Sequence, residues 1–164
     1  MSSDILILFL LIIIVLFGSA WCSGVEAALL TVNPLRVYEL SASPKGATAA
    51  KLLSKLRKRL GRTLSVLVIA NNGFNIFGSL MLGGYSATVF DKRGVSGIAL
   101  PIFSIGLTIL VIIFGEILPK SLSSRFALQV SLASAPILQL LSLVMKPLVL
   151  LLERIMPTIT AENE

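Results

Sequence analysis

The stretch that decides the fold class is ILILFLLIIIVLF, residues 5–17, because it contains no polar or charged side chain. A helix that crosses the hydrocarbon core of a bilayer needs about 20 mainly apolar residues. The sequence continues to Ser23 without a charge, and the flank before residue 5 has no basic side chain. This charge order favours an uncleaved anchor over residues 5–23 rather than a secretory signal peptide.

The rest of the chain extends the same conclusion. Of its 164 residues 55% are hydrophobic and only 13% are charged, whereas a soluble domain usually carries about a quarter charged residues. Two further apolar runs, residues 64–90 and 94–118, are long enough to span. We therefore predict an all-α integral membrane protein, a single transmembrane domain over residues 1–164 with three spanning helices.

The basic residues are concentrated between the first two predicted spans. Glu39 is the only acid among eight basic residues there, namely Arg36, Lys45, Lys51, Lys55, Arg57, Lys58, Arg59 and Arg62. Short loops rich in Lys and Arg stay on the cytoplasmic side, so we expect a multi-pass protein of the cell membrane with its N-terminus outside. Nucleic-acid binding, the other reading of such a patch, is disfavoured because the patch lies between membrane segments.

Two segments have a different pattern from the spans. Residues 48–62 place leucines at helical spacing opposite the basic side chains, which predicts a cytoplasmic amphipathic helix lying against anionic membrane lipids. Residues 126–152 are apolar but interrupted by Gln129, Gln139, Lys146 and two prolines. Hydropathy alone leaves open whether this second segment spans the bilayer or lies at the interface.

Asn71 and Asn75 lie within the second predicted span, where burying a polar side chain in the membrane costs free energy. Their separation of four residues puts them on one face of the helix, which Ser79 extends. Polar groups inside a membrane helix mark function by default. The alternative is that the two amides only hydrogen-bond to a neighbouring helix.

Glu116 is the only acid within the second and third predicted spans, and it precedes Pro119 closely. A proline cannot donate to the helical ladder, so it can leave a carbonyl free about one turn earlier. Ser104 and Thr108 lie further up the same helix and could extend a polar face. The alternative for Glu116 is an interfacial ion pair with Lys120.

Ser23 and Gly24 close the first predicted helix, where a small pair would let the backbone unwind and expose carbonyl oxygens. Glu26 is either a second carboxylate of an ion path or a charge at the N-terminus of the next helix. These groups are hard oxygen donors, which suit Mg²⁺, Ca²⁺ or Na⁺. With no histidine and one cysteine, we expect no zinc site and no internal disulfide, and no catalytic pair indicates an enzyme.

Three motifs give the sequence a family resemblance. Ser23-Gly24-Val25-Glu26-Ala27-Ala28-Leu29 resembles the SGxExAL signature of the CorC/cyclin M (CNNM) magnesium transporters. Asn71-Asn72-Gly73-Phe74-Asn75 resembles their GN-x-x-x-N stretch, with Ala70 in place of the usual glycine. Gly115-Glu116-Ile117-Leu118-Pro119-Lys120-Ser121 is similar to their GE-[IV]-[LIV]-PKS motif, and the three occur in family order.

The resemblance implies a homodimer with three spanning helices per protomer, a cytoplasmic belt of short helices and a final juxtamembrane helix. Residues 126–152 would then lie at the interface and the C-terminus would be cytoplasmic. It implies Na⁺-coupled Mg²⁺ export by alternating access, with ligands from Asn71, Asn75 and Glu116, the Ser23 backbone oxygen and a carbonyl near Leu122, where relatives often have a smaller residue.

Relatives usually continue into a nucleotide-binding CBS module, which we do not expect here, since the chain stops at Glu164. Gly24, Glu26, Ser79, Ser104 and Thr108 would belong to the ion path, and Pro119 to a helix break. A Mg²⁺-sensing scaffold or regulator that does not itself transport is the alternative function.

Overall fold

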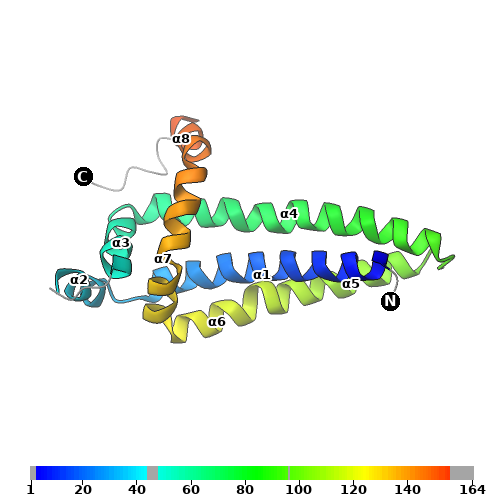
Figure 1. The fold of residues 1–164 in the computed structure, drawn as a ribbon, viewed down its shortest axis with the longest axis horizontal. Coiled ribbons are helices and arrows are strands. Elements are labelled where there is room, and N and C mark those ends of the chain that lie inside the picture. Colours follow the sequence, from blue (N-terminus) through cyan, green and yellow to red (C-terminus); the bar gives the residue numbers. More distant parts are fainter. Residues whose placement is uncertain (1–2, 44–47, 96, 156–164) are drawn as a thin grey trace. The chain divides into compact units, whose positions relative to one another are not determined.

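A computed structural model describes residues 3–43, 48–95 and 97–155, and these residues form helices and short turns without a strand. In chain order the elements are α1 (Ser3–Thr31), α2 (Pro34–Ala42), α3 (Thr48–Arg57), α4 (Leu60–Lys92), α5 (Ala99–Leu110), the π-helix η1 (Val111–Ile117), α6 (Leu118–Arg125), α7 (Ala127–Val144) and α8 (Lys146–Ile155) (Figure 1). The predicted cytoplasmic tail after residue 155 lies outside the described residues, so its location stays a prediction.

Helices long and apolar enough to cross a membrane confirm the multi-pass, all-α class. Four stretches of the described chain qualify by length and composition: Ser3–Thr31, Leu60–Lys92, Ala99–Arg125 and Ala127–Val144. The first three correspond to the predicted spans. The fourth is α7, so the predicted count of three spanning helices is not confirmed.

The chain divides into two compact units. Unit 1 contains the residues up to Ser23 and Ala70–Pro119, and unit 2 contains Gly24–Ile69 and the residues from Lys120 onward. The chain passes from one unit to the other within α1, within α4 and at the start of α6. The two units are described separately below.

In unit 1, α1, α4 and the α5–η1 run lie side by side (Figure 1). Their shared core forms around Leu8, Val15 and Leu82, with Phe103 and Leu107 of α5 packed against it. Glycines allow close approach between α1 and α4, because a Cβ on Gly18 would lie 2.4 Å from the Phe74 ring and one on Gly78 would lie 2.5 Å from Val15. Small residues are the usual means by which membrane helices pack closely.

The turn after α4 explains why this helix stops. Gly94 has φ of +63°, a conformation in which a glycine is favoured. Val95 N–H donates to Phe90 O at 3.1 Å and Gly94 N–H donates to Asp91 O at 3.0 Å. This pair of bonds is the Schellman arrangement that ends many helices at a glycine.

In unit 2, α3 packs against both α2 and α7 (Figure 1). Leu53 of α3, Val37 of α2 and Leu138 of α7 are almost completely buried. The Arg57 guanidinium at the end of α3 donates to Leu29 O at 2.7 Å and Val32 O at 3.3 Å. It thereby satisfies carbonyl oxygens at the end of α1 that have no partner within their own helix.

The predicted end of the first helix at Ser23-Gly24 is wrong, because α1 continues to Thr31. Val25, Ala28 and Leu29 extend its buried face, and this packing offsets the roughly 1 kcal/mol by which a glycine weakens a helix interior relative to alanine. Asn33 and Pro34 then start α2, where the Asn33 side chain accepts a bond from Leu35 N–H at 2.9 Å.

The third predicted helix also runs further than expected, through Pro119 to Arg125. The backbone accommodates the proline with the π-helix η1, in which Leu118 N–H donates to Ile113 O, five residues back. Pro119 then occupies the first turn of α6, where an N–H is not required. The predicted break is therefore a change of helical pitch and not an end.

The predicted bounds of the amphipathic segments differ from the observed helices. The helix expected over residues 48–62 ends at Arg57, and Leu60 starts α4. Thr63 Oγ1 donates to Leu56 O at 3.0 Å, which satisfies a carbonyl at the end of α3. The segment expected over residues 126–152 is two helices, α7 and α8, that meet at Met145.

Candidate cation site

Polar groups from α1, α4 and η1 meet inside unit 1. Ser19 Oγ of α1 donates to Asn71 Oδ1 of α4 at 3.0 Å and lies 3.5 Å from the backbone oxygen of Gly115 in η1. Ser19 and Gly115 are buried and Asn71 is half-buried. The predicted carbonyl one turn before Pro119 is thus found facing a side chain of another helix.

The second contact joins the carboxylate to an amide. Asn75 Nδ2 donates to Glu116 Oε1 at 3.3 Å, and both side chains are half-buried. Asn71 and Asn75 lie one turn apart on α4, so the two contacts stack along the same face. The pairing of Asn75 with Glu116 across two helices is the closest match between the structure and the predicted site.

Two side-chain oxygens on α1 and α4 of unit 1 have no hydrogen-bond partner. They are Asn75 Oδ1 and Ser23 Oγ, both buried. A buried polar atom without a partner costs about 1–3 kcal/mol, so such atoms are rare in native structures unless a ligand or water completes them. Ser23 lies one helical turn beyond Ser19 on α1, which places both hydroxyls on one face of that helix.

Gly115 keeps the site compact. A Cβ at this position would lie 3.2 Å from Ser19 Oγ, a distance at which one of the two groups has to move. The π-helical turn and this glycine together let the backbone of η1 approach α1. π-turns of this kind occur often at functional sites.

The donor set is chemically specific. It consists of one carboxylate, two amides, two hydroxyls and a backbone oxygen, all of which are hard ligands. No group of three or more His, Cys, Asp or Glu that could hold a metal ion occurs among the residues described. The oxygens present suit a hard cation held mainly by neutral ligands.

The alternative in which Glu116 pairs with Lys120 is wrong. In unit 2, Lys120 Nζ lies 3.8 Å from Glu26 Oε2 instead. The suggestion that Glu26 starts the next helix is also wrong, because Glu26 lies within α1 and α2 begins at Pro34. Its possible role in an ion path stays a prediction.

The remaining predicted residues lie elsewhere. Ser104 and Thr108 are exposed, and their hydroxyls donate to Leu100 O at 2.9 Å and Ser104 O at 2.8 Å in their own helix. Ser79 is exposed, while Gly24 is buried inside the continuous α1. Leu122 belongs to unit 2, where its backbone oxygen accepts a helical bond from Phe126 N–H at 3.2 Å.

Ser19 is the member of the site that the sequence analysis did not identify. Ser19 precedes Ser23 by one helical turn. A serine pair at this spacing in an otherwise apolar helix is the signal that could have identified it.

Comparison with known proteins gives the family of the chain. Residues 10–164 match the family described as the cyclin M transmembrane N-terminal domain. The chain belongs to the CNNM (cyclin M) family. This assignment confirms the resemblance inferred from the three motifs, and the CNNM family is not a family of enzymes.

The curated relatives of this CNNM chain are bacterial UPF0053 proteins. A UPF0053 protein of Synechocystis is 39% identical over 144 residues, which cover 88% of this chain and 40% of the relative. The UPF0053 inner membrane protein YfjD of Escherichia coli is 32% identical over 137 residues, 84% of this chain and 30% of the relative. A UPF0053 protein of Haemophilus influenzae is 36% identical over 145 residues, with 88% and 33% covered. The chain thus spans less than half the length of each.

Proposed function

We propose that this CNNM domain transports Mg²⁺, with the ion bound at the oxygen cluster of unit 1. The observation that carries the proposal is the pair of unpartnered buried oxygens, Asn75 Oδ1 and Ser23 Oγ, taken together with the contact between Asn75 and Glu116. A cation would give both oxygens a partner by coordination, and the Glu116 carboxylate would attract it. An amide can donate through Nδ2 to the carboxylate while its oxygen binds the ion.

Each ligand in the proposal has its own position in unit 1. Glu116 supplies the charge, Asn71 and Asn75 supply amide oxygens, and Ser23 supplies its hydroxyl. The hydroxyl replaces the Ser23 backbone oxygen of the sequence-based prediction, because a backbone oxygen within the continuous α1 is part of the helical ladder. The carbonyl near Leu122 is not included in the proposed ligand set, because it accepts a helical bond from Phe126 N–H.

The ligand chemistry and the family resemblance support Mg²⁺ as the ion. Mg²⁺ prefers octahedral oxygen ligands and gives up its water reluctantly. One carboxylate leaves a divalent ion with net positive charge, so binding is weak enough for release. Na⁺ accepts the same hard oxygens, which supports Na⁺ as the coupling ion of an exporter.

Alternating access in a homodimer completes the proposal. Transporters bind ions where membrane helices depart from regular α geometry, and η1 is such a departure next to Glu116. Gly83 and Gly84 of α4 have open space around them, which would let a second copy approach closely.

The test is Mg²⁺ flux in liposomes that contain the purified protein and an entrapped Mg²⁺ dye, with and without a Na⁺ gradient. Glu116→Gln should abolish flux. Glu39→Gln is the matched control, because it removes the same charge from a side chain that is 53% exposed and that pairs with Arg36 on its own helix. Equal flux in wild type and Glu116→Gln would refute the proposed site.

A Mg²⁺-sensing scaffold is the second candidate. It is favoured by Ser104 and Thr108, whose hydroxyls bond to their own helix and so do not extend the polar cluster along α5. Mg²⁺ binding measured by calorimetry on the same samples separates the two functions. Binding that depends on Glu116, without flux under any gradient, would favour the sensor.

A further inference from the structure

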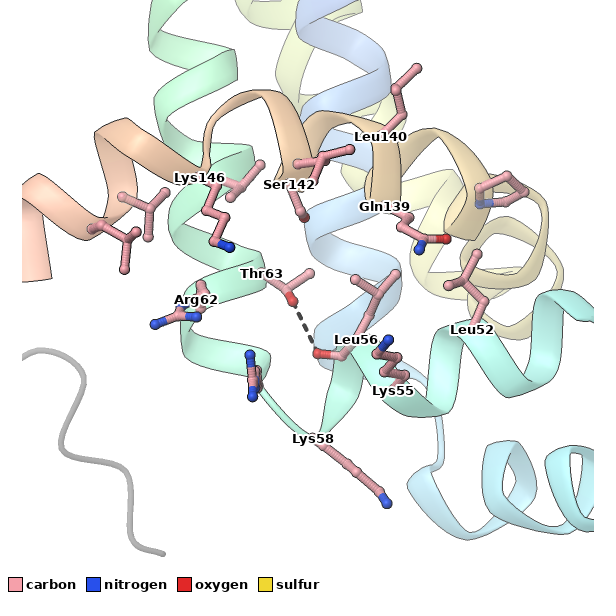
Figure 2. Close-up of a pocket in the computed structure, with 16 residues that line it drawn as sticks. Leu52, Lys55, Leu56, Lys58, Arg62, Thr63, Gln139, Leu140, Ser142 and Lys146 are labelled. Carbon is pink, nitrogen blue, oxygen red and sulfur yellow. Dashed lines mark hydrogen bonds between the residues drawn. The ribbon is translucent and has the colours of Figure 1, made fainter.

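A second polar region lies entirely within unit 2. A cavity of about 740 Å³ opens between α3 and the first turns of α4 on one side and α7 and α8 on the other (Figure 2). None of the residues proposed to bind the cation lines it. Its chemistry is opposite to that of the cation site.

Positive charge dominates the walls of this cavity. Among the residues that the structure describes, no acidic side chain lines it and five basic ones do: Lys55, Lys58, Arg59, Arg62 and Lys146. Lys55 belongs to α3 and Lys146 is the first residue of α8, so the charges come from separate helices. In Figure 2 the Lys146 side chain points toward the space between the helices, whereas Lys58 points away from it.

Neutral hydrogen-bonding groups lie between these charges. Gln139 and Ser142 of α7 face α3 across the cavity (Figure 2). The Ser142 hydroxyl is buried and has no hydrogen-bond partner. A buried donor next to lysines is a site that an anionic oxygen would complete, because charge-assisted hydrogen bonds are stronger than neutral ones.

The cavity also has an apolar wall. This wall favours a lipid as the ligand over a soluble anion. Leu52 and Leu56 of α3 line one side, and Leu140 and Leu143 of α7 line the other. Leu140 and Leu143 are 63% and 67% exposed, so they offer apolar surface for a ligand to cover. A free phosphate or nucleotide would leave this surface in water, whereas acyl chains would bury it.

We propose that this cavity binds the headgroup of an anionic phospholipid. The phosphate lies among Lys55, Lys146 and the Ser142 hydroxyl, and the acyl chains lie along the leucines of α7. This assigns a defined lipid site to unit 2, beyond the general attraction of a basic segment to a negative membrane surface. It does not depend on the proposed Mg²⁺ site.

The test measures lipid binding to the full chain in detergent by native mass spectrometry. Phosphatidylglycerol and phosphatidylcholine with identical acyl chains are titrated in parallel, and wild type should bind phosphatidylglycerol more tightly. Each basic residue near an anionic lipid contributes about a five-fold change in affinity. The double variant Lys55→Gln/Lys146→Gln should therefore weaken phosphatidylglycerol binding by roughly 25-fold, two five-fold steps if they act independently.

The matched control is Lys51→Gln/Arg154→Gln. It removes the same charge from the same two helices, α3 and α8, at side chains that do not line the cavity. The control should bind phosphatidylglycerol as wild type does, and Lys55→Arg/Lys146→Arg should restore binding. Circular dichroism of each variant verifies that the helices are intact.

Three results would overturn the proposal. Equal losses in the two double variants would show non-specific attraction to charge. Equal affinity of wild type for the two lipids would show that the cavity does not recognise the charge of the headgroup. Displacement of the lipid by inorganic phosphate or glycerol 3-phosphate at similar concentrations would assign the cavity to a soluble anion.

Discussion

Unit 1 and unit 2 use polar groups in opposite ways. In unit 1 a few neutral oxygens and the carboxylate of Glu116 lie among apolar helices, and few hydrogen bonds join them. Unit 2 has five basic residues around one cavity, so its charge is shared. The comparison teaches that one substitution should have a large effect where a site depends on one charge and a smaller effect where several charges overlap.

The largest effect is expected from variants that each lose one kind of binding, either of the cation or of the lipid, and keep the other. Glu116→Gln should weaken Mg²⁺ binding about 10- to 100-fold, the equivalent of losing a charged hydrogen-bonding partner, while phosphatidylglycerol binding stays unchanged. Lys55→Gln/Lys146→Gln should show the reverse. Calorimetry with Mg²⁺ and the lipid titration measure both variants. A variant that lost both activities would contradict the division between the units.

The next effect concerns the close packing of α1 and α4 in unit 1. Gly78→Leu forces a side chain into Val15, and overpacking of this kind costs about 1–3 kcal/mol. Gly106→Leu is the control, because Gly106 also lies inside a helix and has open space around it, so the substitution gains the same helix propensity. Loss of helical circular dichroism on heating should occur at lower temperature for the first variant only. Equal midpoints would show that α1 and α4 are not held this closely.

A similar but more local effect is expected in unit 2 at Arg57. Arg57→Gln removes the guanidinium bonds to Leu29 O and Val32 O, which should destabilise the chain by about 1.5–3 kcal/mol. Burial lowers the pKa of Arg57 from its ordinary value, but a guanidinium stays protonated at neutral pH. The loss should therefore be the same on either side of neutrality. Arg36→Gln, an exposed control, should shift the unfolding midpoint much less.

The membrane class was predictable, since apolar runs are visible in the sequence, and the polar residues inside those runs indicated most of the candidate site. Asn75 and Glu116 were predicted as partners in one site, and the structure joins them at 3.3 Å. The helix ends were harder to predict. Gly24 and Pro119 are helix-weakening residues, yet α1 continues because its next turn is buried, and the third span continues because η1 accommodates the proline.

The sequence also did not predict which side chains on different helices contact each other. Lys120 could pair with Glu116 one turn away or with Glu26 far along the chain, and spacing alone favoured the nearer residue. Tertiary packing decides between such partners. The cavity of unit 2 was hidden for the same reason, because Lys55 and Lys146 are distant in sequence and lie on its walls only after α3, α7 and α8 pack.

The smallest effect is expected at Glu26, and it sharpens the comparison because Glu26 is the acid of unit 2 that the motif analysis connected with an ion path. Its contact with Lys120 at 3.8 Å is partly exposed, with side-chain exposures of 24% and 49%, and such pairs contribute at most about 1 kcal/mol. Glu26→Gln and Lys120→Gln should therefore change stability equally and by little, and the double variant should lose no more than either. Flux should change by less than about five-fold, the kinetic equivalent of 1 kcal/mol. A larger loss of flux in Glu26→Gln than in Lys120→Gln, with equal unfolding midpoints, would place this carboxylate on the path of the ion. Unit 2 would then take part in cation transport as well as in the proposed binding of an anionic lipid.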